Sequence, residues 1–230
     1  MKCRGWPILV ALALAACGGE VPVPEPAASA TEPAAGTAPV TGPERHILAF
    51  GDSLFAGYGV GEENSYPAKL EAALRARGID AHVANAGVSG DTTAAGLQRI
   101  EFVLDGLGEK PDLAIVELGG NDLLRGISPE ETRANLSAIL EELDEREIPV
   151  LLVGMRAPPN LGAAFVEDYD ALYPEIARQY GAALVPFFLA PVYDKPELIQ
   201  PDRIHPTTEG IEVLVGATVE KVREALPGET

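Results

Sequence analysis

Cysteine is nearly absent from the sequence, and the few that occur are clustered. The 230-residue chain has two cysteines, Cys3 and Cys17, and both lie within its first 17 residues. The rest of the chain therefore has no disulfide and no cysteine-ligated metal site. Basic residues are also scarce, because 17 Lys and Arg stand against 35 Asp and Glu, for a formal net charge of -18. We expect no nucleic-acid partner, since phosphates are repelled by such a surface.

Long apolar runs and nucleotide-binding signatures are missing as well. The apolar run at residues 8–16 is far shorter than the roughly 20 residues that a transmembrane helix needs. Neither GxGxxG nor GxxxxGK followed by Ser or Thr occurs, so dinucleotide-binding and P-loop functions lose their support. No pattern in the sequence requires a cofactor, and we expect none.

The first residues have the features of a targeting segment. Lys2 and Arg4 form a positive region ahead of the apolar run, as in secretory signal peptides. Residues 14–18 (LAACG) resemble a bacterial lipobox, in which the cysteine is lipidated and becomes the mature N-terminus. We therefore expect residues 1–17 to be a lipoprotein-type signal peptide with Cys17 as the lipidated residue. The alternative is an ordinary cleaved signal peptide with an incidental cysteine.

This N-terminus predicts a location in the bacterial cell envelope. A lipid on Cys17 would hold the protein on a membrane, facing the periplasm, without a transmembrane helix. Without the lipid, we expect a periplasmic protein. Residues 18–44 are rich in Pro, Ala, Glu, Thr and Gly, and we interpret them as a flexible tether. Residues 45–230 then form the folded domain.

From residue 45 onward, apolar β-type runs alternate with helical patterns. Five short runs are typical of buried strands, at residues 46–50, 81–84, 113–118, 150–153 and 183–187. Helical patterns cover residues 66–77, 129–146, 163–180 and 208–225. Ser128 and Pro129 mark a helix start, as N-cap and first helical residue. The alternation predicts an α/β fold, a flavodoxin-like three-layer α/β/α sandwich with a five-stranded parallel sheet.

Small polar residues gather where the predicted strands end, at the edge where open α/β sheets bind ligands. Ser53 follows the first strand as a candidate nucleophile. Gly90 and Asn121 follow the second and third strands, where a backbone amide and a side-chain amide are able to donate hydrogen bonds. Asp202 precedes His205 by three residues, close enough to bond Nδ1 and leave Nε2 free. Together these residues predict a nucleophile, oxyanion donors and an oriented base.

This order of blocks resembles the GDSL or SGNH hydrolase family. The resemblance runs through residues 51–54 (GDSL), 89–91 (SGD), 119–122 (GGND) and 202–205 (DRIH). Other stretches, 116–122 (VELGGND) and 186–188 (PFF) among them, are similar to the bacterial periplasmic thioesterase, lysophospholipase and arylesterase subgroup.

The resemblance implies the SGNH hydrolase fold and a role for each residue of the site. Ser53 is the implied nucleophile, and Asp202 and His205 complete the triad. Ser53, Gly90 and Asn121 form the implied oxyanion hole, with no metal ion. The chemistry of the residues agrees, because His205 would take the proton from Ser53 and return it to the leaving alcohol or thiol. We expect a serine esterase that acts on small-molecule ester or lipid substrates, with arylesterase, lysophospholipase or acyl-thioesterase activity.

The segment 156–162 follows the fourth strand and reaches the same edge of the sheet. We predict that Pro158 and Asn160, in this segment, bind substrate by lining the acyl pocket. The alternative is a loop that proline merely stiffens.

Five further polar residues are interpreted as structural. Asp52 is expected to support the turn around the nucleophile. Asp91 and Asp122 are expected to cap helices or to support residues of the site from behind. His46 and His82 stand at or inside predicted strands, and we expect them to belong to the core or its edge.

Three other functions remain open at this level. The domain is alternatively a non-catalytic lipoprotein that binds lipid or glycan, since fold alone does not fix function. A metal-dependent hydrolase built on Asp52, Asp202 and His205 is a second alternative, which metal removal tests. A carbohydrate O-acetyl esterase is the third, and the polarity of the pocket separates it from an acyl-chain hydrolase.

Overall fold

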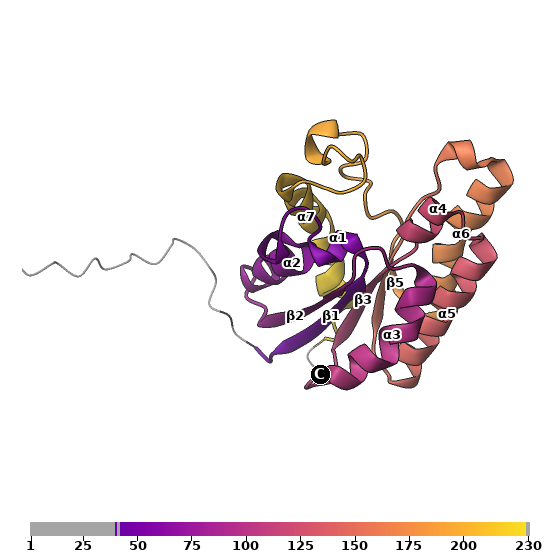
Figure 1. The fold of residues 1–230 in the computed structure, drawn as a ribbon. Helices are drawn as coiled ribbons and strands as arrows, with labels where there is room; N and C mark the ends of the chain where they lie inside the picture. The colour runs from indigo at the N-terminus through magenta and orange to yellow at the C-terminus, as the bar shows by residue number, and fades with distance from the viewer. Residues whose placement is uncertain (1–39, 41, 229–230) are drawn as a thin grey trace, which may run out of the picture. The chain divides into compact units, whose positions relative to one another are not determined.

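Five parallel strands form the middle layer of the fold (Figure 1). Their order across the sheet is β2-β1-β3-β4-β5, which is the flavodoxin-like order. The strands are β1 Arg45–Gly51, β2 Ala81–Gly87, β3 Leu113–Glu117, β4 Val150–Val153 and β5 Ala183–Val185. The inner strands β1, β3 and β4 are largely buried. Burial on both faces explains why their sequences are continuous apolar runs rather than alternating patterns.

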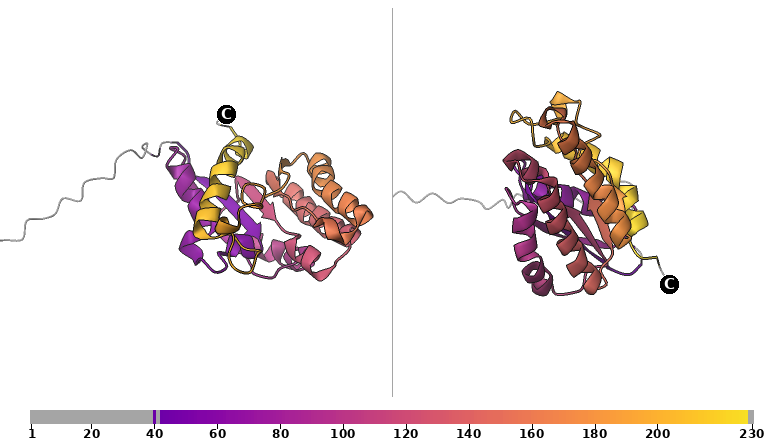
Figure 2. Two further views of the ribbon diagram at one scale, coloured as in Figure 1. Left: turned by 90° about the horizontal axis from the view of Figure 1, so that it is seen from above. Right: turned by 90° about the vertical axis from the view of Figure 1, so that its right-hand side faces the viewer.

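Helices cover both faces of the sheet (Figure 2). Two of them pack together on one face, α2 Tyr66–Arg75 and α7 Thr208–Ala225. Three pack side by side along the other face, α3 Thr93–Gly106, α5 Pro129–Glu145 and α6 Ala163–Tyr180. The shorter elements are α1 Ser53–Ala56, η1 Glu62–Asn64, α4 Gly120–Arg125, η2 Pro159–Leu161 and η3 Pro196–Leu198. The expected three-layer sandwich is therefore confirmed.

The boundaries of the elements follow local signals that the sequence displays. Ser128 accepts a hydrogen bond from Glu131 N at 3.2 Å as the N-cap of α5, and Pro129 is its first residue, as predicted. The last strand is shorter than expected, because β5 ends at Val185. Helix α3 was not among the helices named from the sequence, although Thr92 caps it through a hydrogen bond from Ala95 N.

The structure, a computed structural model, describes residue 40 and residues 42–228. The predicted signal peptide, with Cys17, lies outside the described residues, as does most of the predicted tether. Within the described residues, no helix combines the length and the apolar character needed to cross a membrane.

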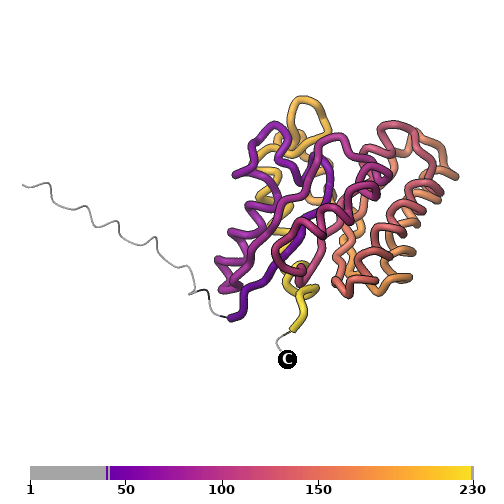
Figure 3. Tube along the Cα trace, turned by 60° about the horizontal axis from the view of Figure 1, so that its bottom comes forward, coloured from indigo at the N-terminus to yellow at the C-terminus, as the bar shows by residue number. Residues whose placement is uncertain are grey.

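The chain returns to the carboxyl end of β1 late in its course. In Figure 3 the segment that follows β5 lies beside the turn that follows β1. Ser53 and His205, from these two segments, are 152 positions apart in sequence and 2.8 Å apart at their nearest side-chain atoms. The fold therefore brings the first and last predicted site residues to one edge of the sheet.

Candidate active site

Ser53 is held at a tight turn between a buried strand and a short helix. Asp52 is the N-cap of α1, and its Oδ1 accepts a hydrogen bond from Leu54 N at 3.0 Å. Ser53 is the first residue of α1, so its backbone N–H has no partner within the helix. The expected role of Asp52 in supporting this turn is confirmed.

His205 reaches the serine from the loop that precedes α7. Its Nε2 lies 2.8 Å from Ser53 Oγ, within hydrogen-bond distance. The loop is closed at its base, where Gln200 N donates to the carbonyl of His205 at 2.7 Å. Gln200 Nε2 also donates to the carbonyls of Tyr58 and Pro206, each at 2.9 Å. These bonds tie the loop to the segment after Ser53.

Asp202 holds the other side of the imidazole. Its Oδ2 lies 2.7 Å from His205 Nδ1, and its Oδ1 accepts hydrogen bonds from Ile204 N at 2.9 Å and His205 N at 3.1 Å. Partial burial raises the pKa of the Asp202 carboxyl, but the hydrogen bonds from Ile204 and His205 outweigh it and leave that pKa below its ordinary value. Asp202 is therefore ionised at neutral pH and orients the histidine.

Tyr58 covers the imidazole, a contact that the sequence did not reveal. The rings of Tyr58 and His205 have centroids 4.3 Å apart at an interplanar angle of 31°. Tyr58 is still half exposed, so it forms part of the rim of the site. The only indication of this contact in the sequence is that Tyr58 lies four residues after the GDSL block.

Two residues predicted as oxyanion donors lie near Ser53, Gly90 in the loop after β2 and Asn121 in the first turn of α4. Gly90 and Asn121 line the same cavity as Ser53. Gly90 has φ of +88°, a conformation that favours glycine, so its backbone amide is presented by a turn that other residues would strain. Asn121 Nδ2 donates to Asp52 Oδ2 at 2.9 Å. That bond uses one of the two amide hydrogens and leaves the other available to a ligand.

Behind the turn lies a buried pair of carboxyl groups. Glu117 is fully buried, and its Oε2 lies 3.4 Å from Asp52 N. Burial, together with the neighbouring charge of Asp52, raises the pKa of Glu117 well above its ordinary value. Burial also raises the pKa of Asp52, although hydrogen bonds from Leu54, Glu117 and Asn121 oppose that rise. The proton therefore resides on Glu117, which leaves Asp52 as the acceptor that orients Asn121.

A cavity of about 540 Å³ opens in front of Ser53. More than half of its lining residues are aliphatic or aromatic: Leu54, Tyr58, Leu123, Leu124, Met155, Pro158, Phe187, Leu189, Tyr193, Ile199 and Ile204. Several of them are also exposed at the rim, among them Leu124 and Tyr193. The space beside Ser53 is therefore suited to an apolar group.

The two residues predicted to line this cavity have different positions. Pro158 is one of its lining residues. Asn160 is exposed within η2 and is not among the lining residues. Sequence reasoning also missed Phe187 and Met155, which approach the cavity from segments after β5 and β4.

Asp91 and Asp122 act from behind the site. Asp91 accepts a hydrogen bond from Arg99 Nε at 2.6 Å, and Arg99 also donates to the carbonyl of Gly51 at 3.0 Å. Asp122 is fully buried and accepts bonds from Thr93 N at 2.9 Å and from the hydroxyl of Thr132 at 3.3 Å. Both carboxylates therefore fix the backbone of the loops that present the site, and neither lines the cavity.

Comparison with known proteins gives consistent matches. Residues 49–213 match the GDSL-like Lipase/Acylhydrolase family. An arylesterase of Vibrio mimicus is 40% identical over 163 residues, which cover 71% of this chain and 80% of the relative. The thioesterase 1/protease 1/lysophospholipase L1 of Escherichia coli is 38% identical over 163 residues, covering 71% of this chain and 76% of the relative.

A solved structure extends the similarity to the fold. The crystal structure of AlinE4, described as an SGNH-hydrolase family esterase, is 65% identical in sequence, with a TM-score of 0.69. The match covers 82% of this chain and all of the other. The chain therefore has the same fold as this esterase.

Proposed function

The chain belongs to the GDSL-like lipase/acylhydrolase family, and from that premise we propose that it is a serine esterase in which Ser53 forms the acyl-enzyme. The observation that carries the proposal is the continuous hydrogen-bonded chain from Ser53 Oγ through His205 to Asp202, with distances of 2.8 and 2.7 Å. A serine, a base and an orienting carboxylate in this geometry activate the hydroxyl for attack on a carbonyl.

Acylation follows from the positions of these three side chains. Ser53 Oγ forms a bond to the carbonyl carbon of the ester or thioester while His205 Nε2 takes the hydroxyl proton. The tetrahedral intermediate then collapses, the bond to the alcohol or thiol breaks, and His205 gives its proton to that leaving group. Asp202 stabilises the imidazolium and keeps the Nδ1 proton directed toward itself. Water repeats the sequence and releases the acid.

The oxyanion is held by the N–H groups of Ser53 and Gly90 and by the side-chain amide of Asn121. All three residues line the cavity. The bond from Asn121 to Asp52 Oδ2 fixes the amide before substrate arrives, and such preorganised donors provide much of the catalysis in acyl transfer.

The cavity favours esters with an apolar acyl or aromatic group over acetylated carbohydrate. Its lining is dominated by aliphatic and aromatic side chains, whereas a sugar ring would need several convergent polar groups. Arylesterase, lysophospholipase and acyl-thioesterase substrates all supply such an apolar group.

A chain-length series tests this assignment. We expect p-nitrophenyl esters with acyl chains longer than acetyl to have the highest kcat/KM, with unchanged rates in the presence of a chelator. Acetylated oligosaccharides as preferred substrates would favour the carbohydrate esterase. A folded protein inactive on every ester would favour the non-catalytic binding protein, and inhibition by the chelator would favour the metal-dependent hydrolase.

Replacing Asn121 with alanine is expected to lower kcat by about 10²–10³-fold with little change in KM, because a donor to the transition-state oxyanion is lost. Steady-state kinetics on the preferred ester measures both values. Asn135→Ala is a matched control, since Asn135 bonds Thr93 and does not line the cavity. A normal kcat in N121A would show that Asn121 is not part of the oxyanion hole.

We propose further that Cys17 is lipidated and holds the enzyme in the cell envelope. The support is the lipobox-like sequence of residues 14–18 after a short apolar run. In a bacterial host, Cys17→Ser is expected to move the protein from the membrane fraction to the soluble fraction, without loss of specific activity. Retention of C17S on the membrane would contradict the anchor.

A further inference from the structure

A second group of ionisable side chains lies at the amino ends of the strands, opposite to the carboxyl ends where Ser53 is found. The same short pattern, an acidic residue just before the strand and a histidine two positions later, occurs as Glu44-Arg45-His46 at β1 and as Asp80-Ala81-His82 at β2. In the parallel register, His46 pairs with His82 and Arg45 with Ala81. Side chains two residues apart along a strand share a face. The two carboxylates and the two imidazoles are therefore brought together at the amino ends of β1 and β2.

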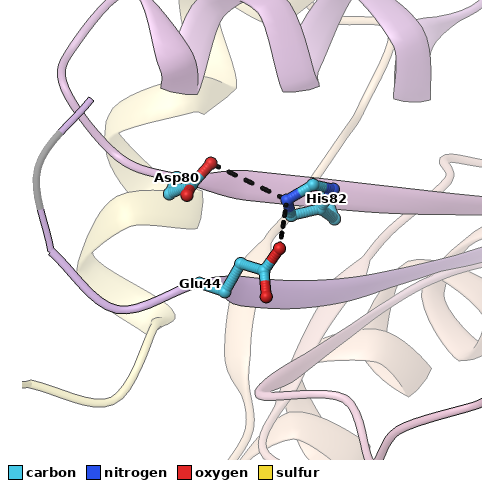
Figure 4. A group of neighbouring side chains, drawn as sticks. All are labelled: Glu44, Asp80 and His82. Atoms are coloured by element: carbon cyan, nitrogen blue, oxygen red, sulfur yellow. Dashed lines mark ion pairs between the residues drawn. The ribbon is translucent and has the colours of Figure 1, made fainter. Parts of the chain in front are cut away.

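The carboxylates converge on one imidazole nitrogen (Figure 4). His82 Nε2 lies 3.0 Å from Glu44 Oε1 and 3.7 Å from Asp80 Oδ1. One ligand atom from each of these three residues lies within 4.8 Å of the other two. Ligand atoms bound to one zinc ion at about 2.0–2.2 Å are roughly 3–3.5 Å apart, so the side chains need only small rotations to bind one.

Two polar atoms at this cluster lack a hydrogen bond among the described residues, although each lies close to a group able to form an ion pair with it. Asp80 Oδ1 and His46 Nε2 are buried and form no hydrogen bond within the described part of the chain. Arg75 Nη1 is 3.0 Å from Asp80 Oδ1, and Glu109 Oε2 is 2.8 Å from His46 Nε2, yet neither contact has hydrogen-bond geometry. Buried polar atoms of this kind normally find a partner.

We propose that Glu44, Asp80 and His82 bind one first-row divalent metal ion, with Zn²⁺ as the best fit. One imidazole nitrogen and two carboxylate oxygens are a ligand set that zinc accepts, and water fills its fourth position. The set is less suited to Ca²⁺ or Mg²⁺, which prefer oxygen ligands alone. Arg75 balances the charge on Asp80, whose Oδ1 has a second lone pair for the metal.

His46 is placed to support the ligands rather than to be one of them. Its Nε2 is 3.9 Å from Glu44 Oε2, the oxygen that His82 does not contact, and its ring stacks on His82 with centroids 5.7 Å apart. A metal ion here would join the start of β1 to the start of β2. It would therefore stabilise the fold without taking part in ester hydrolysis at the carboxyl ends of the strands.

Isothermal titration calorimetry of the full-length protein with ZnCl₂ tests the site. We expect His82→Gln or Glu44→Gln to weaken binding of one equivalent by more than about tenfold, since even supporting groups of metal sites contribute that much. Glu109→Gln is the matched control, because it removes one nearby negative charge outside the ligand set and is expected to keep that equivalent. Zinc is expected to raise the Tm of the wild type and not that of H82Q.

The outcomes separate coordination from general attraction to an acidic surface. Zinc bound at His205 would give an equivalent that persists in H82Q and E44Q and is lost in His205→Gln. Esterase activity without added zinc is expected to be unchanged in H82Q and E44Q. Equal weakening in E109Q and H82Q, or unchanged binding in both H82Q and E44Q, would overturn the proposal.

Discussion

Ser53→Ala is expected to lower kcat for ester hydrolysis by about 10⁶-fold, the loss typical when a triad serine is removed. Without Oγ no acyl-enzyme forms, and the remaining rate comes from binding and from the oxyanion donors. Ser89→Ala is a suitable control, because Ser89 lines the same cavity and has no assigned part in the chemistry. We expect that control to stay within a few-fold of the wild type.

The histidine provides an internal test of the same prediction. His205→Ala alone, and the double variant with Ser53→Ala, are expected to be about as inactive as Ser53→Ala, because triad residues act as one unit. Steady-state rates of the three variants on one ester give the comparison. Multiplicative losses in the double variant would mean that the two residues act in separate steps.

Asp202→Asn is expected to lower kcat by about 10⁴-fold, by analogy with the effect of this change in other triads. Asparagine is able to accept the hydrogen bonds that Asp202 Oδ1 receives from Ile204 and His205, so the loop is expected to keep its position. What is lost is the negative charge next to His205 Nδ1, 2.7 Å away, and with it the preferred tautomer.

Thermal unfolding of D202N provides the control, since its Tm is expected to stay close to that of the wild type. The pH profile of the wild type adds a further constraint. The pKa of Asp202 lies below its ordinary value of 3.8, so the carboxylate is charged at every pH above that value. A decline in activity between pH 7 and pH 5 therefore cannot come from protonation of Asp202. Normal kcat in D202N would mean that the negative charge of Asp202 is not needed for catalysis.

Much of the site was predictable because its residues follow strands. Ser53 follows the apolar run of β1, and Asn121 follows β3 in the first turn of α4, so the parallel topology brings both to the carboxyl end of the sheet. The spacing of Asp202 and His205 allowed a local hydrogen bond that the structure contains. Pairing between β1 and β2 was likewise implied by the strand order of the predicted fold.

Other features of the site depend on packing between segments that are far apart in sequence. Such contacts leave little trace in the sequence pattern. Glu117 ends the apolar strand β3, and its complete burial could not be anticipated for a charged residue type. Tyr58 lies beside His205 across two segments that are far apart in sequence, and Gln200 bonds the second segment to the carbonyl of Tyr58. His46 and His82 were interpreted as structural from their positions at or inside predicted strands. The register that places them side by side is a property of the assembled sheet, which the sequence does not display.

The central claim is that Ser53 carries the acyl group, and trapping that residue tests it most directly. The protein is incubated with diethyl p-nitrophenyl phosphate, and released p-nitrophenol and the modified peptide are measured together. We predict one equivalent of p-nitrophenol, complete loss of activity, and a diethylphosphoryl group on the peptide that contains Ser53. A label on a different residue, or full activity after exposure, would contradict the assignment of Ser53 as nucleophile.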